Sequence, residues 1–174
     1  MYKGEKINSI THLVGSALAL PAVIILIVMA FSIGDTVKIV SISIYGFTLF
    51  ILYLFSTLYH SFRGTAKTVF QRFDHIGIFL LIAGTYTPFT LITLHGMWGW
   101  SIFGFVWGLA VFGITMVAIF GERVGWLRLI LYVVMGWCIV VAMKPLTASM
   151  DPAGLAWLMA GGLFYTVGII FYAW

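Results

Sequence analysis

The chain has 174 residues, of which 63% are hydrophobic and 8% are charged, and its formal net charge is +4. A water-soluble domain of this composition would lack enough polar surface to cover itself, so the composition excludes a soluble globular protein. The excess positive charge suits anionic lipid headgroups. Basic patches with interleaved aromatic residues are absent from the sequence, which argues against a nucleic-acid partner. We therefore predict an integral membrane protein whose partners are membrane lipids.

Long apolar runs divide the chain, and each is close to the roughly 20 residues that an α-helix needs to cross a bilayer. The six runs cover residues 8–32, 38–60, 75–94, 98–120, 125–143 and 153–173. The longest polar stretch, 61–74, is predicted to be a loop. The alternating pattern of a transmembrane β-barrel does not occur. The predicted fold is an all-α, polytopic transmembrane helical bundle that forms a single domain over residues 1–174.

Glycines in two of these runs indicate close helix packing. Gly104 and Gly108 form a GxxxG motif in the fourth run, and Gly161, Gly162 and Gly168 lie in the sixth. Small residues at such spacing let two helix backbones approach each other in a membrane. These glycines are common and unspecific packing signals.

The basic residues at the ends of the runs indicate the orientation in the membrane. One set of ends carries Lys3, Lys6, Arg63, Lys67, Arg72, Arg123 and Arg128, whereas the other carries Lys38 and Lys144. Basic residues are retained on the cytoplasmic side of a membrane. The N-terminus is therefore predicted to be cytoplasmic.

Polar side chains gather at one depth, near the predicted cytoplasmic ends. They are His12, Ser56, His60, Asp74 and His75. Ser56 and His60 are four residues apart, so they share one helix face and lie about 6 Å apart along its axis. An ionisable residue in a membrane span costs a few kcal/mol, which favours a functional role. The alternative is that His60 is hydrated at a helix end and that Asp74 is a polar N-terminal residue of the third helix. Spacing alone leaves both interpretations open.

Two motifs at these positions resemble the signatures of the haemolysin III and progestin/adipoQ receptor family. They are Glu5, Asn8 and His12 in ExxNxxxH, and Ser56, His60 and Asp74 in SxxxH…D. The short N-terminus and minimal loops are similar to the bacterial haemolysin III branch of a wider superfamily that includes alkaline ceramidases. The resemblance implies a seven-helix, multi-pass bundle in the bacterial plasma membrane, with a cytoplasmic N-terminus.

The same resemblance implies a zinc ion near the cytoplasmic face, bound by His60 and by two histidines of a later HxxxH motif. This chain contains no HxxxH and ends inside an apolar segment, so we expect it to be a truncated form of a longer protein. A catalytic zinc ion takes three protein ligands, and His60 with Asp74 supplies at most two. We therefore expect this chain to bind zinc weakly or not at all. His12 or His75 could complete a substitute site, although the spacing does not require it.

The resemblance implies three alternative functions. We favour a metal-dependent hydrolase of lipid amide or ester bonds, in which Asp74 activates water and Ser56 bonds the carbonyl oxygen. The alternative is a receptor-like or membrane-homeostasis protein, without enzyme activity, that holds structural zinc. Lysis through a pore is less favoured, because a pore needs a continuous polar lining.

Overall fold

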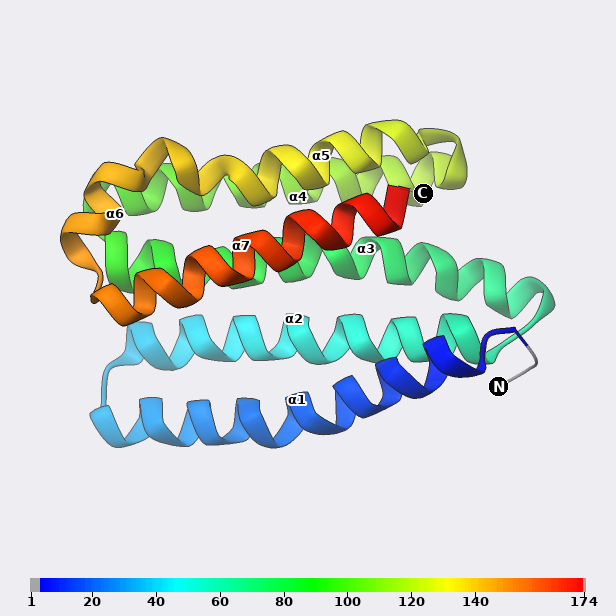
Figure 1. Cartoon of the computed structure of the whole chain (residues 1–174), viewed down its shortest axis with the longest axis horizontal. Helices are drawn as coiled ribbons and strands as arrows, with labels where there is room; N and C mark the ends of the chain where they lie inside the picture. Colours follow the sequence, from blue (N-terminus) through cyan, green and yellow to red (C-terminus); the bar gives the residue numbers. More distant parts are fainter. Residues whose placement is uncertain (1–3, 174) are drawn as a thin grey trace.

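The computed structural model describes residues 4–173, which are almost entirely helical and contain no strand. The long helices are α1 (Lys6–Ile33), α2 (Thr36–Ser61), α3 (Gly64–Pro88), α4 (Gly96–Phe120), α5 (Gly125–Trp137) and α7 (Pro152–Ala173). The shorter elements are a π-helical turn (Phe89–Leu94), two 3-10 turns (Gly121–Val124 and Cys138–Ala142) and α6 (Met143–Ser149). The long helices lie alongside one another in an elongated bundle (Figure 1). The predicted all-α transmembrane bundle is confirmed.

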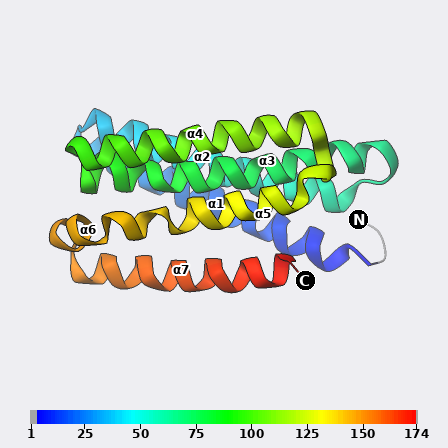
Figure 2. The same cartoon turned by 90° about the horizontal axis from the view of Figure 1, so that it is seen from above.

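Five helical stretches among the described residues are long and apolar enough to cross a membrane. One of them, Gly96–Ser149, has 54 residues and folds back on itself at Gly121, whose φ of 58° lies in the left-handed region that glycine adopts at little cost. As a result, α5 runs back along the bundle and contacts α4, and Figure 2 shows the sharp turn that joins them. The runs predicted as 98–120 and 125–143 are therefore two passes of one continuous helical stretch.

The predicted loop over 61–74 is wrong, because α3 begins at Gly64. Only Phe62 and Arg63 link α2 to α3. The segment is polar on average, but Phe70 stacks on Phe62 with ring centroids 5.3 Å apart. An amphipathic helix of this kind keeps its polar residues outside while its aromatic residues pack, and average polarity does not distinguish it from a loop.

The corrected start of α3 changes the position of Asp74. The carboxyl group lies ten residues inside the helix instead of at its N-terminus. Asp74 therefore cannot act as a helix cap, and the interpretation of this residue as an N-terminal polar residue is also wrong. Its neighbour Phe73 stacks on Phe55 of α2 at 5.1 Å between centroids, which holds this part of α3 against α2.

Residues of α3, α4 and α5 form the core. The side chains of Phe79, Val106 and Met135 are fully buried there. The Tyr86 hydroxyl donates to the carbonyl of Gly136 at 2.9 Å and accepts from the amide of Ile139 at 2.9 Å. These two bonds lie where α5 gives way to a 3-10 turn, so Tyr86 satisfies backbone groups at the helix end.

Close approach between helices occurs at other glycines than predicted. A Cβ built on Gly104, Gly108, Gly161, Gly162 or Gly168 meets no described atom within 4 Å. A Cβ on Gly84 of α3 would lie 2.1 Å from the Thr48 hydroxyl of α2, and one on Gly46 would lie 2.2 Å from Val23 of α1. The close approach that those five glycines would allow does not occur among the described residues, and the packing of α1, α2 and α3 depends on Gly46 and Gly84.

Replacement of Gly84 by Ala is expected to lower the free energy of unfolding by about 1–3 kcal/mol, because the new methyl group overpacks the contact with Thr48. The control is Gly108→Ala, where space is open and the better helix propensity of Ala should add up to about 1 kcal/mol. Unfolding of the purified protein by SDS in mixed micelles measures both. Equal effects of the two substitutions would contradict the packing described above.

Candidate functional site

The end of the bundle where α1 begins carries most of the basic residues, and we call it the basic end. It comprises the starts of α1, α3 and α5 and the ends of α2, α4 and α7 (Figure 1). Its described basic residues are Lys6, Arg63, Lys67, Arg72, Arg123 and Arg128. The predicted site residues Glu5, Asn8, His12, Ser56, His60 and Asp74 all lie at this end.

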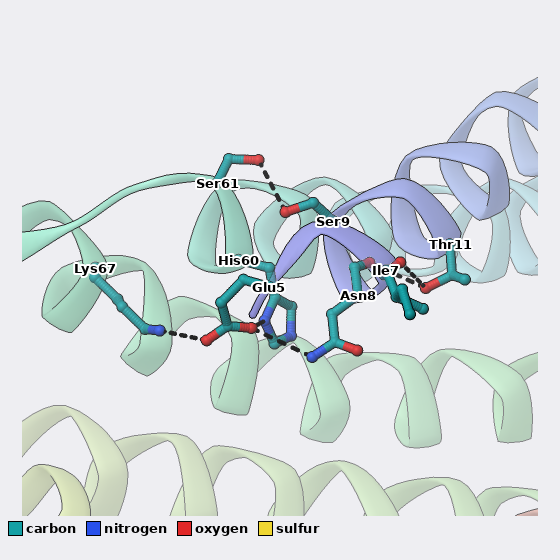
Figure 3. Close-up of polar contacts among 8 residues, drawn as sticks. All are labelled: Glu5, Ile7, Asn8, Ser9, Thr11, His60, Ser61 and Lys67. Atoms are coloured by element: carbon teal, nitrogen blue, oxygen red, sulfur yellow. Dashed lines mark hydrogen bonds and ion pairs between the residues drawn. The ribbon is translucent and has the colours of Figure 1, made fainter. Parts of the chain in front are cut away.

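Glu5, Asn8, His60 and Lys67 form a hydrogen-bonded group that we call the Glu5 cluster (Figure 3). The Glu5 carboxylate accepts from Lys67 Nζ at 2.6 Å and from Asn8 Nδ2 at 3.2 Å, and it lies 2.7 Å from His60 Nδ1. A second link joins the same helices, because the Ser61 hydroxyl donates to that of Ser9 at 3.4 Å. The start of α1 is thus bound to the end of α2 and the start of α3.

The charge of Glu5 fixes the protonation pattern of His60. The hydrogen bond from Lys67, with smaller effects of His60 and Asn8, outweighs partial burial and lowers the pKa of Glu5 from its ordinary 4.5 to about 2. A carboxylate only accepts hydrogen bonds, so His60 Nδ1 carries the proton. In the neutral ring, Nε2 then keeps its lone pair for a proton or a metal ion. This is the second-shell arrangement that commonly orients a metal-binding or catalytic histidine.

Aromatic rings surround His60. The His12 ring stacks on it with 5.4 Å between centroids and 4° between planes, and the Tyr59 ring lies at 4.5 Å. Lys67 Nζ also lies 5.1 Å from the centre of the Tyr59 ring. His12, the third residue of the first motif, therefore contacts the second motif through its ring, and the two motifs form one structure.

Ser56 and Asp74 meet beside this cluster. Ser56 is buried on α2, one turn before His60, and its hydroxyl lies within hydrogen-bonding reach of the Asp74 carboxyl group on α3. Asp74 also interacts electrostatically with His60 and with Arg128 of α5. The structure therefore brings Ser56, His60 and Asp74 together between α2 and α3, as their matched motif implies.

A second polar group, which we call the Arg128 cluster, comprises His75, Glu122 and Arg128. Arg128 is buried, and its Nη1 lies 2.7 Å from His75 Nδ1 and 3.4 Å from the Glu122 carboxylate. Arginine can only donate, so His75 Nδ1 is the acceptor. The Glu122 carboxylate lies 3.0 Å from the same His75 nitrogen, so the three side chains form one polar group. The Tyr132 hydroxyl donates to the His75 carbonyl at 2.7 Å, which ties α5 to α3.

The residues present do not make a complete zinc site. No three His, Cys, Asp or Glu side chains within residues 4–173 are arranged to hold a metal ion. His60 Nε2 and the Asp74 carboxylate offer two donors where a catalytic zinc ion takes three from the protein. His75 contacts Arg128 and Glu122 in the Arg128 cluster.

Three residues of these clusters were missed by reasoning from the sequence. The sequence pattern uses Lys67 and Arg128 only to predict the orientation, and it assigns no role to Glu122. A signal existed for Arg128, which lies inside the run 125–143, where an unpaired charge would be costly. No sequence signal links Lys67 to Glu5, because the pairing depends on how α1 docks on α3.

The contacts of Glu5 bind the start of α1 to α2 and α3, and their stability should depend on pH. In Glu5→Gln this pH dependence is expected to disappear. The pKa of Glu5 is lower in the folded state than in the unfolded state, so ionised Glu5 stabilises the fold above about pH 4.5. This contribution to stability is lost as the pH falls toward about 2. Amide hydrogen-exchange protection factors in the first two turns of α1 should therefore fall over this interval in the unmodified chain. In Glu5→Gln they should be lower at neutral pH and nearly constant. An identical pH profile in both proteins would exclude Glu5 as the anchor.

Comparison with known proteins places these features in context. A family model described as "Haemolysin-III related" matches residues 1–174. "Hemolysin-3" of Bacillus cereus is 45% identical over 173 residues, which cover 99% of this chain and 79% of that protein. The "Hemolysin-3 homolog" of Bacillus subtilis (strain 168) is 44% identical, with 99% and 81% covered. The human "Monocyte to macrophage differentiation factor" is 28% identical over 135 residues, with 74% and 56% covered. No solved structure matches the chain at a significant level.

Proposed function

Because the chain belongs to the haemolysin-III related family and forms a multi-pass membrane bundle, we propose that it hydrolyses amide or ester bonds of membrane lipids at its basic end. The observation that carries this proposal is the meeting of Ser56, His60 and Asp74 in one place, with the His60 ring oriented by Glu5. Groups able to move a proton and to donate a hydrogen bond are rarely placed together in a membrane span without a function.

The proposed steps use Asp74 and Ser56. Asp74 takes a proton from a water molecule, whose oxygen adds to the lipid carbonyl carbon. Ser56, buried beside Asp74, donates a hydrogen bond to the water or to the carbonyl oxygen as negative charge develops on it. The bond from the carbonyl carbon to nitrogen or oxygen then breaks. Asp74 gives the proton that it took from water to the leaving amine or alcohol, and a fatty acid is released.

Zinc is part of the proposal through the family resemblance, with His60 as its candidate ligand. Nε2 of this ring is the atom that the contact with Glu5 leaves available. No group of three metal-binding side chains occurs among the described residues, so the zinc content of the purified protein tests this part of the proposal directly.

We also propose that the basic end faces the cytoplasm and that the protein lies in the bacterial plasma membrane. The described residues at this end include six Lys or Arg, namely Lys6, Arg63, Lys67, Arg72, Arg123 and Arg128, against Lys38 and Lys144 at the other. This asymmetry supports a cytoplasmic N-terminus. The active groups would then meet lipids of the inner leaflet.

A non-enzymatic role as a receptor-like or membrane-homeostasis protein is the second candidate. The Glu5 cluster favours it, because Glu5 is already bound to His60 and Lys67 and holds three helices together. In that case His60 would serve the fold and not a reaction. Lipid turnover separates the two candidates.

The test uses the purified chain reconstituted in vesicles that contain, in turn, a ceramide, phosphatidylglycerol or an N-acyl amine lipid. Fatty-acid release is quantified by mass spectrometry, and zinc is measured in the same samples, for the unmodified chain and for His60→Ala. The proposal expects release from at least one lipid and its loss in His60→Ala. Absence of release from every lipid, with the protein folded, would overturn the hydrolase and favour the receptor-like role.

A further inference from the structure

An open groove of about 450 Å³ lies between α3 and α4 at the basic end, outside both polar clusters. Its lining includes Thr65, Thr68, Arg72, Phe73 and Ile76 of α3 and Ala118 of α4. No acidic residue is among the lining residues. The groove therefore offers one positive charge, two hydroxyl groups and an apolar floor.

Arg72 is the charged group of this groove. Its side chain is exposed, and it forms no hydrogen bond or ion pair with another described residue. The guanidinium group rests against the backbone of Gly121, where a Cβ would lie 3.3 Å from both Nε and Nη2. The turn after α4 therefore passes beside the guanidinium group of this exposed side chain. An arginine in this state is available to an anion.

The order of the lining residues along α3 matches the order of groups in a phospholipid. Thr65 and Ile76 are eleven residues apart, which corresponds to about 16 Å along the helix axis. The polar residues Thr65, Thr68 and Arg72 lie toward the end of the bundle, and Phe73 and Ile76 lie toward the middle of the span. In a membrane the first part faces the headgroups and the second faces the hydrocarbon.

From this arrangement we infer that the groove binds one anionic glycerophospholipid, with its phosphate on Arg72 and an acyl chain along Phe73, Ile76 and Ala118. Thr68 lies one helical turn from Arg72 and supplies a hydroxyl donor to the phosphate or glycerol oxygens. Basic pockets between transmembrane helices on the cytoplasmic side are suited to anionic headgroups. This site is separate from Ser56, His60 and Asp74, and it does not depend on the proposed hydrolysis.

The site is tested by native mass spectrometry of the detergent-purified chain titrated with phosphatidylglycerol, phosphatidylcholine or glycerol phosphate. The variants are Arg72→Gln, which removes the charge, and Ala118→Trp, which fills the apolar part at an exposed position. Arg123→Gln is the control, because Arg123 is an exposed arginine at the same end that does not line the groove.

Arg72→Gln is expected to weaken phosphatidylglycerol binding about fivefold, the contribution of one basic residue near an anionic surface. Ala118→Trp should weaken it as well, and Arg123→Gln should bind like the unmodified chain. Phosphatidylcholine and glycerol phosphate should bind several-fold more weakly than phosphatidylglycerol. Unchanged binding in both Arg72→Gln and Ala118→Trp would overturn the site. Equal binding of phosphatidylcholine would exclude selection for an anionic headgroup, and equal binding of glycerol phosphate would exclude a lipid.

Discussion

Replacement of Asp74 by Asn is expected to reduce the turnover of the lipid substrate by about a hundredfold or more, the usual effect of losing a general base. The amide has nearly the same shape as the carboxyl group, so Ser56 keeps a partner and α2 and α3 should stay packed. An amide cannot take a proton from water, however. Initial rates of fatty-acid release in vesicles measure the effect.

Asp151→Asn is the matched control for this substitution. Asp151 is an exposed carboxylate at the opposite end of the bundle, where it accepts from the amide of Ala153 at 2.8 Å, and Asn can keep that bond. Turnover should therefore be unchanged in this variant. Asp74→Asn with the rate of the unmodified chain would show that Asp74 is not the base, even if hydrolysis were established.

Loss of the Glu122 side chain is expected to lower the free energy of unfolding by about 3 kcal/mol, because it removes the carboxylate that is ion-paired with the buried charge of Arg128. The value lies at the lower end of the range for broken buried pairs, since Glu122 itself is half exposed. SDS unfolding of Glu122→Ala measures the loss.

The double variant Glu122→Ala with Arg128→Met tests the cause. Methionine fills a similar volume without a charge, so the double variant should recover most of the stability that Glu122→Ala loses. A double variant as unstable as Glu122→Ala would mean that the Arg128 charge is not the source of the loss.

The fold class was predictable from the sequence because length and hydropathy act on each segment separately. A run of apolar residues such as 98–120 must be helical in a membrane, whatever it packs against. The error over 61–74 has the opposite cause. Within that segment Phe70 stacks on Phe62, and Phe73 stacks on Phe55 of α2, and local polarity does not report such contacts.

The candidate site was predictable in part. His60 and Asp74 flank a helix reversal, so α2 and α3 bring them to the same end of the bundle. The pairing of Lys67 with Glu5 across 62 positions, and of Arg128 with His75 across 53, depends on how separate helices dock. The orientation of the His60 ring by Glu5 could not be predicted either, because it also follows from a contact between two separate helices, α1 and α2.

The most direct test of the proposed hydrolysis is the reaction of the reconstituted chain in water enriched in ¹⁸O. If water activated beside Asp74 attacks the lipid carbonyl, mass spectrometry should find ¹⁸O in the carboxyl group of the released fatty acid. The label should fall to background in Asp74→Asn and remain in Asp151→Asn. Fatty-acid release that is no higher in the unmodified chain than in Asp74→Asn would contradict the proposed site.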